Sequence, residues 1–567
     1  MNFKATELRG MFKVDRIIKN AKIFTSDKEK LNATALAIKD GKFVYVGDDA
    51  GISDFEGDVV DFGGKFIMPA IIDSHVHVAM GVVFEYSDPE PYIDCTNKKE
   101  CRAFIAEHVK KNPGVRRYRF LLERKKLNGE ILTKENLDSI CADSEIVILE
   151  DEGHSVWVNS KVLAAYGITD ETPDIVPELS YYVRDAAGHV TGNMFEGAEM
   201  EIILDNSNEL TDEQIETALQ RWIDYSVNEG ISVVFDAGTP KADAFHERCY
   251  KILCELDKEG RLPVYVDGCF AIMDPRDISH AVETVTRYNR EYNTEHVKVH
   301  TLKMFMDGTL KIHTAAMVTP YADTNTKGAT LINKEQMKDL LIKLNEVGWD
   351  FHVHSVAEAA SRVVLDGVEL ARAELGDKFH IKVTCAHLEI QDDADLDRFS
   401  KLGVIANYTV WWHADTISGD NYDEYLELLG EDRIKKMYRC KTVWDTGALV
   451  TWSSDNIAYA DFMTWSPYLG MEVGMTRWIT EKTKASAHNR GAKEFPAACE
   501  KMNIEEMILG YTINGAKQLG IESSKGSIEV GKDADYLVFT ENLLDAPAEG
   551  LSFKMPAEIY FSGKKMN

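Results

Sequence analysis

The chain has 567 residues and a mass of 63.8 kDa, enough for a large catalytic core with at least one further domain. Its 94 acidic and 64 basic residues give a formal net charge of −30, which argues against a nucleic-acid or membrane partner, because both favour a basic face. The nine cysteines include no C-x-x-C pair, and residues 1–9 lack the apolar core of a signal peptide. We therefore expect a soluble, cytoplasmic protein that acts on a small molecule, with a homodimer as the commonest assembly for an enzyme of this size.

Both ends of the chain are predicted to form short β-strands. Between residues 14 and 59, apolar stretches alternate with turn dipeptides such as Asp40-Gly41, a pattern typical of antiparallel hairpins. Residues 525–561 have the same character. Because the two ends are built alike, we predict one composite β-sandwich domain from residues 1–67 and 518–567.

The middle of the chain alternates apolar, β-rich runs with helix-length amphipathic segments. Eight such runs are predicted as strands: the run that ends at His75, and residues 231–236, 263–267, 297–305, 349–354, 381–387, 404–408 and 449–455. Helices are predicted between them, for example at residues 335–346 and 357–374. This alternation favours a (β/α)8 TIM barrel, at residues 68–80 and 226–517, over an open doubly wound sheet, which periodicity alone does not exclude.

The gap between the first and second predicted strands is too long for a single crossover. It contains helical stretches at residues 99–111 and 211–228, and the segment 153–163. We predict an inserted α/β subdomain at residues 81–225. Because the loops after barrel strands form the active-site face, this subdomain is expected to cover the mouth of the site.

Candidate metal ligands stand at the C-terminal ends of several predicted strands. His75 and His77 are two residues apart, so an extended strand projects both imidazoles from one face toward one ion. Asp455 ends the eighth strand, which neighbours the first in a closed barrel, and would complete that ion's site. His354 and His387, from strands five and six, would bind a second ion.

Lys303 stands at the end of the fourth strand, between these two groups. A free ammonium would repel two divalent ions, so the lysine belongs there only if its amine is carboxylated to a carbamate that bridges both metals. Otherwise Lys303 would be a solvated rim residue or a substrate clamp.

Each assignment has a structural alternative. His387 could be a packed core histidine, His352 could replace its same-face neighbour His354, and Asp455 could cap the following segment. All of these alternatives would have to be true together, at strand ends that a barrel brings to one rim. We therefore favour the metal site.

Several segments together resemble the amidohydrolase superfamily, and within it the type 3 branch that contains N-substituted formamide deformylase-like proteins. They are residues 66–78, 153–163, 303–309, 354–358, 454–455, 511–516 and 526–536. The resemblance implies a terminal β domain beside the barrel and zinc ions, two per chain, or other divalent metals. It assigns metal-site roles to His75, His77, Lys303, His354, His387 and Asp455. One departure is Ala386-His387 where the family has Glu-His, so Glu389 or water would have to support His387.

This constellation predicts hydrolysis of a carbon–nitrogen bond in an amide, N-formyl, N-acyl or cyclic amide substrate. A metal-activated hydroxide would attack the carbonyl, while Asp455 takes the water proton and later delivers it to the leaving nitrogen. One alternative is a mononuclear aminohydrolase that deaminates a heterocycle, with the metal held by His75, His77, His354 and Asp455. Another is a non-catalytic, metal-binding regulatory protein.

Six further residues are candidates for contact with the substrate: His154, Trp157, His313, Trp411, Trp412 and His413. The aromatic residues after the seventh strand favour an apolar or aromatic N-substituent. They could equally form a hydrophobic lid that packs against the insertion.

Overall fold

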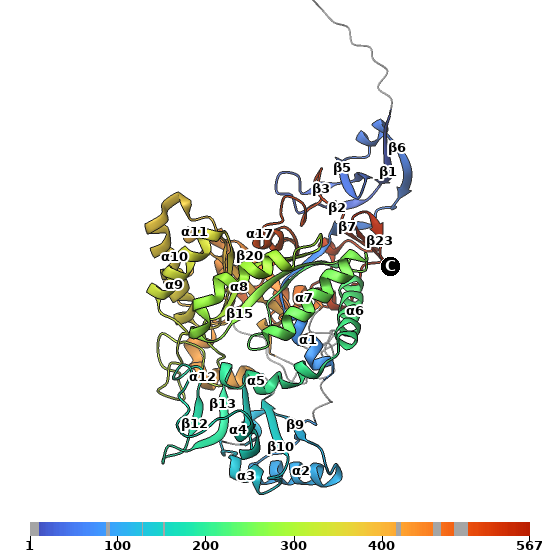
Figure 1. The fold of residues 1–567 in the computed structure, drawn as a ribbon. Coiled ribbons are helices and arrows are strands. Elements are labelled where there is room, and N and C mark those ends of the chain that lie inside the picture. The colour runs from blue at the N-terminus through green and yellow to red at the C-terminus, as the bar shows by residue number, and fades with distance from the viewer. Residues whose placement is uncertain are drawn as a thin grey trace, which may run out of the picture.

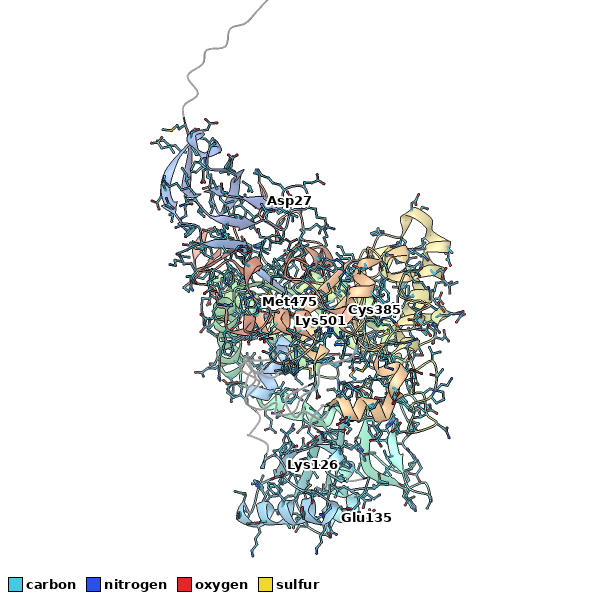
Figure 2. The ribbon with its side chains drawn as sticks, turned by 180° about the vertical axis from the view of Figure 1, so that it is seen from behind. Asp27, Lys126, Glu135, Cys385, Met475 and Lys501 are labelled. Atoms are coloured by element: carbon cyan, nitrogen blue, oxygen red, sulfur yellow. The ribbon has the colours of Figure 1, made fainter. Side chains whose placement is uncertain are left out.

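The computed structural model describes residues 11–86, 91–127, 129–150, 153–415, 421–457, 466–480 and 497–567. Residues 1–9, on which the signal-peptide prediction rests, lie outside these ranges. Figure 1 shows the N-terminal strands at one end, the barrel in the middle and the insertion at the opposite end. The reverse view agrees, with Asp27 and Glu135 at opposite ends (Figure 2). Within the described ranges, no helix is long and apolar enough to cross a membrane.

Eight parallel strands form the central sheet, in the order of the chain. They are β8 (Ile71–Val76), β14 (Ile231–Asp236), β15 (Tyr265–Ile272), β16 (Val297–Phe305), β17 (Asp350–Ser355), β18 (Val383–His387), β19 (Ile405–Thr409) and β20 (Val450–Ser453). The first and last strands meet where Asp455 N donates to His75 O at 2.9 Å and His77 N donates to Asn456 O at 3.0 Å. The predicted (β/α)8 barrel is therefore confirmed.

Helices cover the outside of the barrel. They include α6 (Asp212–Glu229), α7 (Asp243–Lys258), α8 (Ile278–Glu291), α9 (Lys334–Val347), α10 (Glu358–Leu375), α11 (Arg398–Leu402), α12 (Asn421–Ile434), α13 (Cys440–Asp445), α15 (Pro467–Thr476), α16 (Ile504–Leu509) and α17 (Gly515–Leu519). The start and end of α6 follow from its sequence, because Thr211 and Gln214 form a capping box and Gly230 ends the helix at φ 76°. Its buried residues Ile215, Leu219 and Trp222 share one face, which contacts β14 and α7.

Strands from both ends of the chain share one sheet, which confirms the predicted composite domain. β21 (Tyr536–Phe539) pairs antiparallel with β7 (Phe66–Pro69). The rest of this sheet is β2 (Lys22–Phe24), β3 (Asn32–Ala33), β22 (Glu558–Phe561) and β23 (Lys564–Lys565). The second sheet contains β1 (Phe12–Lys19), β4 (Ala35–Lys39), β5 (Lys42–Gly47) and β6 (Phe55–Asp61).

The prediction of antiparallel hairpins at residues 14–59 is right for one pair of strands and wrong for another. β4 and β5 form a hairpin at Asp40-Gly41, whose φ values of 50° and 76° are those of a type I′ turn. β6, however, runs parallel to β1. The reason is topological, because the chain crosses from β5 at one edge of the sheet to the opposite edge before β6 begins.

The insertion has its own sheet, in the order β12-β13-β11-β10-β9. Its strands are β9 (Arg117–Leu122), β10 (Glu145–Glu150), β11 (Ser155–Val158), β12 (Tyr182–Arg184) and β13 (Val190–Phe195), and the helices along this segment are α1 (Val78–Glu85), α2 (Lys98–Lys111), α3 (Lys134–Asp138), α4 (Ser160–Ala165) and α5 (Met200–Ile203). Ile105, Phe120 and Ile148 belong to a separate apolar core between α2 and this sheet. The predicted inserted α/β subdomain is therefore present.

Candidate metal centre

The ends of β8 and β20 bring His75, His77 and Asp455 together. The Nε2 atoms of the two histidines lie 3.3 and 3.4 Å from Asp455 Oδ1. Asp73 holds the two strand ends in register, because its carboxylate accepts hydrogen bonds from Ser454 Oγ at 2.6 Å and Ser454 N at 3.0 Å. Asp455 itself has a left-handed backbone, with φ 51°, a sparsely populated conformation of the kind that clusters at functional sites.

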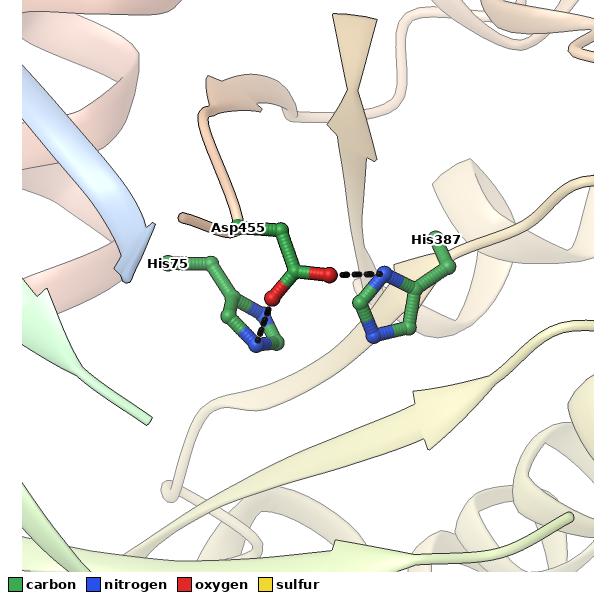
Figure 3. A group of neighbouring side chains, drawn as sticks. All are labelled: His75, His387 and Asp455. Atoms are coloured by element: carbon green, nitrogen blue, oxygen red, sulfur yellow. Dashed lines mark ion pairs between the residues drawn. The ribbon is translucent and has the colours of Figure 1, made fainter. Parts of the chain in front are cut away.

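His387, at the end of β18, lies beside the same aspartate, and His354, on β17, lies next to His387. His387 Nδ1 lies 3.6 Å from Asp455 Oδ2, as Figure 3 shows. The ring centroid of His387 is 4.9 Å from that of His75 and 4.5 Å from that of His354. His354 Nε2 lies 3.2 Å from Gly308 O, so this nitrogen carries the hydrogen and Nδ1 is the nitrogen left to bind a metal.

Lys303, on β16, is fully buried beside these residues. Its Nζ lies 3.3 Å from His75 Nε2, the same nitrogen that faces Asp455. Burial lowers the pKa of Lys303, since the low-dielectric interior disfavours the charged amine. The lysine therefore lies within the histidine cluster, next to His75, and burial shifts its amine toward the neutral form.

Hydrogen bonds behind His77 and His75 orient the rings of these two candidate ligands. His77 Nδ1 lies 2.7 Å from Gly238 O, which leaves Nε2 facing Asp455 as a lone-pair donor. His75 Nδ1 lies 2.9 Å from His352 Nε2, and the His352 ring stacks on Phe235 at 4.5 Å. His352, the sequence alternative to His354, thus contacts His75 at the ring nitrogen that faces away from Asp455.

The protonation states of this group suit a metal. Burial is the main cause that lowers the pKa of His77 to about 4 and the pKa values of His75, His354 and His387 well below their usual range. Neutral imidazole is the form that binds metal ions.

The carboxylate of Asp455 supplies oxygen atoms to this group of residues. Burial raises the pKa of Asp455, and its Oδ1 has no hydrogen-bond partner among the residues that the structure describes. Ring nitrogens of His75, His77 and His387 lie within 3.6 Å of this carboxylate, and His354 lies beside His387. These are the nitrogen and oxygen donors that zinc prefers, so the residues present fit a divalent metal.

Three of the predicted substrate contacts lie beside the ligands. The His154 ring centroid is 6.1 Å from that of His354. Trp412 stacks on His387, with centroids 5.3 Å apart and planes 16° apart. Trp411 Nε1 donates to Ser454 O at 2.7 Å, next to Asp455.

The structure places the other three in different surroundings. Trp157 belongs to the core of the insertion, with the Arg124 guanidinium 4.5 Å above its ring. His313 Nε2 lies 2.8 Å from Asp323 Oδ2 in a partly exposed pair. His413 is buried and stacks on Tyr438 at 4.5 Å.

The expected support for His387 comes from another residue. The Glu389 carboxylate accepts hydrogen bonds from Tyr425 and Tyr438, at 3.3 and 3.2 Å. His387 Nδ1 instead lies 3.3 Å from Thr409 Oγ1. A threonine at the end of β19, and not Glu389, thus contacts the His387 ring.

Sequence reasoning missed two carboxylates at this site, Asp73 and Glu196. Asp73 had a signal, because it precedes His75 by two residues and so shares its face of the strand. Glu196 had none, since only the paired strands of the insertion place it beside His154, where its Oε2 lies 2.8 Å from Nδ1.

Comparisons with known proteins agree with this arrangement. Residues 58–564 match an amidohydrolase family profile. The chain is 26% identical over 358 residues to the exoenzymes regulatory protein AepA of Pectobacterium carotovorum subsp. carotovorum, covering 62% of this chain and 75% of that protein. It is 24% identical to the N-substituted formamide deformylase of Arthrobacter pascens over 97% of each chain.

The fold is also similar to that of a solved structure, an uncharacterized metal-dependent hydrolase from Pyrococcus horikoshii OT3. The TM-score is 0.66 at 21% identity, over 94% of this chain and 99% of that one. With a family profile that spans most of the sequence and a histidine–aspartate cluster at the C-terminal rim of the barrel, this chain belongs to the amidohydrolase family.

Proposed function

We propose that this protein is a metal-dependent hydrolase that cleaves the carbon–nitrogen bond of a small amide, with N-substituted formamides as the first class to test. The observation that carries the proposal is the position of Asp455, whose buried Oδ1 faces the Nε2 atoms of His75 and His77. Membership of the amidohydrolase family supports hydrolysis, and similarity to a formamide deformylase along nearly the whole chain supports the substrate class.

Two groups of residues would hold the metal. His75, His77 and Asp455 would bind one zinc-type ion, and His354 with His387 a second, with Lys303 between them. When bound, such ions act as Lewis acids toward a carbonyl and lower the pKa of water.

Lys303 would serve as a carbamate. A neutral amine adds to carbon dioxide, forming one nitrogen–carbon bond and releasing one proton, and burial favours the neutral form of Lys303. The product places carboxylate oxygens where a cationic amine would otherwise lie 3.3 Å from His75 Nε2. This change would convert a buried amine of the cluster into a ligand.

Asp455 would move the proton. Its carboxylate takes a proton from the attacking water and returns it to the nitrogen that leaves. Burial raises the pKa of Asp455. A carboxylate with a pKa closer to neutral pH accepts a proton more readily than an exposed aspartate and can still release it.

A second candidate function follows from three candidate ligands that lie close together. Among the described residues, His75, His387 and Asp455 offer three donor atoms within 4.8 Å of one another, with His387 in place of the His77 and His354 expected from the sequence. A single ion bound there supports a mononuclear aminohydrolase that deaminates a heterocycle. Similarity to a protein named as a regulator keeps a non-catalytic, metal-binding role as a third candidate.

The test is metal content per chain together with turnover. Wild type, Lys303→Ala and the control Lys382→Ala are purified without chelators and with bicarbonate, and then assayed against N-substituted formamides. We expect about two ions in wild type and the control, and one or none in Lys303→Ala with loss of turnover.

The opposite results select the alternatives. One ion that is unaffected by Lys303→Ala would contradict the bridged site and move heterocyclic deaminase substrates to the front. Metal-loaded wild type that turns over neither amides nor heterocycles would favour the regulatory role.

A further inference from the structure

Two glycines at the rim of the barrel accept hydrogen bonds from candidate metal ligands. Gly238 O lies 2.7 Å from His77 Nδ1, and Gly308 O lies 3.2 Å from His354 Nε2. Each glycine comes after a strand that neighbours the strand of its histidine, β14 beside β8 and β16 beside β17. The rings of both ligands are therefore oriented by backbone carbonyl groups of a neighbouring strand end.

The backbone at these two glycines is tightly packed. Gly238 has φ 89°, a region that favours glycine, and a Cβ atom there would lie 2.7 Å from Ala271 Cβ. A Cβ atom at Gly308 would overlap Glu196 Oε1 and Thr314 Oγ1. The position of each carbonyl group therefore depends on the contacts that hold the surrounding turn.

Asp236 holds the first of these turns. It is the last residue of β14 and is 1% exposed. Its Oδ1 accepts hydrogen bonds from Val78 N at 3.1 Å and from Gly238 N at 3.4 Å. Because Val78 directly follows His77, this one carboxylate fixes the backbone of the ligand and the backbone of the carbonyl that orients it.

His246 fixes the orientation of the Asp236 carboxylate. Its Nε2 lies 2.8 Å from Asp236 Oδ2, so it donates to the oxygen that faces away from the turn. His246 belongs to α7, and its ring lies 4.3 Å from that of Tyr250, one turn later. The Tyr250 hydroxyl accepts a hydrogen bond from Cys269 N at 2.8 Å, which anchors this helix face on β15.

Asp307 holds the second turn in the same way. It directly precedes Gly308 and is 1% exposed. Its carboxylate accepts hydrogen bonds at 2.9 to 3.0 Å from the backbone N–H groups of Ala316, Val356 and Ala357. Because Val356 lies two residues after His354, one carboxylate again connects the ligand's backbone with that of the carbonyl that orients its ring.

We propose that Asp236 and Asp307 are positioning residues for the metal centre, Asp236 acting through His77 and Asp307 through His354. The inference rests on metal binding by these histidines, as in the proposed function. Each carboxylate holds two backbone segments in one arrangement, and without it the ligand and its carbonyl acceptor are no longer fixed relative to each other. Zinc affinity should fall about 10- to 100-fold when either carboxylate is removed.

The test is a set of double-mutant cycles on the full-length, zinc-loaded protein. Zinc affinity is measured by competition with a chromogenic chelator. Asp236→Ala should lower it in wild type and in His354→Ala, but add little in His77→Ala, because the ligand through which Asp236 acts is then absent. Asp307→Ala should show the reverse pattern. Effects that add in full in both histidine backgrounds would mean a general loss of rim structure and would overturn the inference.

Asparagine variants give a second readout without a histidine substitution. In Asp236→Asn, Oδ1 can still accept from both N–H groups, and the amide N–H can donate to the other tautomer of His246. In Asp307→Asn, either orientation turns the amide N–H toward a backbone N–H. Asp236→Asn should therefore keep most of the affinity that Asp236→Ala loses, whereas Asp307→Asn should lose as much as Asp307→Ala. The opposite ranking would overturn the inference.

A matched control lies at the other end of α7. Asp257 accepts a hydrogen bond from His296 N at 2.8 Å and lies 2.6 Å from His296 Nδ1, at the start of β16. Asp257→Ala removes a carboxylate with the same kinds of partner and should keep wild-type zinc affinity. A loss as large as that of Asp236→Ala would overturn the inference.

These measurements separate the inference from the proposed function. Wild type that binds zinc but hydrolyses no amide would reject the proposed function, and the cycles would still decide the roles of Asp236 and Asp307. Wild type that binds no zinc would overturn the inference.

Discussion

The two ends of the barrel carry the same residue types in different proportions. At the C-terminal rim, His75, His77 and His387 lie beside one aspartate, Asp455, with His354 next to His387 and Lys303 next to His75. Near the strand starts the proportion is reversed. There His300 lies between Asp267, at 3.3 Å, and Asp350, at 3.8 Å, and Lys382 lies 3.7 Å from Asp350.

The difference shows why only one end fits a metal. One imidazole between two carboxyl groups can be satisfied by hydrogen bonds among them, because a proton on either residue type supplies the donor. Several buried, neutral imidazoles beside one carboxylate present several lone pairs. Protonating all of these rings would place like charges next to one another, whereas one divalent cation can accept all of the lone pairs. The number of imidazoles per carboxylate, more than the residue types themselves, therefore distinguishes a metal site from a network of ion pairs.

The largest expected effect is at the rim. Asp455→Asn keeps the shape of the side chain but removes the proton acceptor, so kcat should fall about 10³-fold. The measurement is steady-state turnover of an N-substituted formamide, with metal content determined on the same sample. Asp267→Asn, at the other end of the barrel, is the control and should keep both. Unchanged turnover in Asp455→Asn would rule out its proton-transfer role.

At the base, the expected effect is on stability and its pH dependence. Burial raises the pKa of Asp267 to about 7, so the folded state holds the proton more tightly than the unfolded chain, where the aspartate pKa is about 3.9. The contribution of Asp267 to the free energy of unfolding is therefore largest below about pH 4. It falls by at most about 4 kcal/mol as the pH rises to about 7.

Asp267→Asn removes that penalty. Its melting temperature relative to wild type should therefore rise between pH 5 and pH 8, while Asp432→Asn, at a side chain 101% exposed, should follow wild type throughout. Thermal melts at several pH values make the comparison. Parallel curves for Asp267→Asn and wild type would mean that His300 keeps the carboxylate ionised over this range.

A smaller effect is expected behind the metal ligands. His352→Phe removes the partner of His75 Nδ1 but keeps a ring that can stack on Phe235, so metal affinity should fall about 10- to 100-fold. Competition with a chromogenic chelator measures this. His352→Gln, which can still reach His75 with a polar group, should retain more affinity than the phenylalanine variant, and the reverse order would contradict an orienting role.

The smallest effect is expected from the exposed part of the base. Lys382→Met removes a contact of 3.7 Å with Asp350 from a side chain that is 34% exposed. Such pairs contribute about 0–1 kcal/mol, so the melting temperature should change little and metal content not at all. A loss of metal in this variant would show that the two ends of the barrel are coupled.

The fold was largely predictable from local patterns. All eight predicted strand segments overlap barrel strands, because parallel strands buried on both faces appear in sequence as continuous apolar runs such as residues 231–236. The helical stretch predicted at residues 211–228 corresponds to α6, whose ends are a capping box at Thr211 and a glycine at position 230. The parallel pairing of β1 with β6 was not predicted, since strand order within a sheet depends on contacts remote in sequence.

At the site, the sequence predicted residue types at strand ends but not every partner. His75 and His77 were recognisable from their spacing, and Asp455 from its place at the end of the last strand. Thr409 behind His387, and Glu196 behind His154, come from other elements, so no spacing in the chain connects them with the residues that they contact.

By itself, the sequence determined the (β/α)8 barrel, the composite β domain and the strand-end positions of the candidate ligands, because apolar periodicity and the i, i+2 rule are local properties of the chain. Only the tertiary structure decided which histidine lies behind another, that Asp455 Oδ1 faces two imidazoles without a hydrogen bond among the described residues, and that Glu196 ties the insertion to the rim. Those relations depend on closure of the barrel and docking of the insertion, which bring together atoms separated by up to several hundred residues.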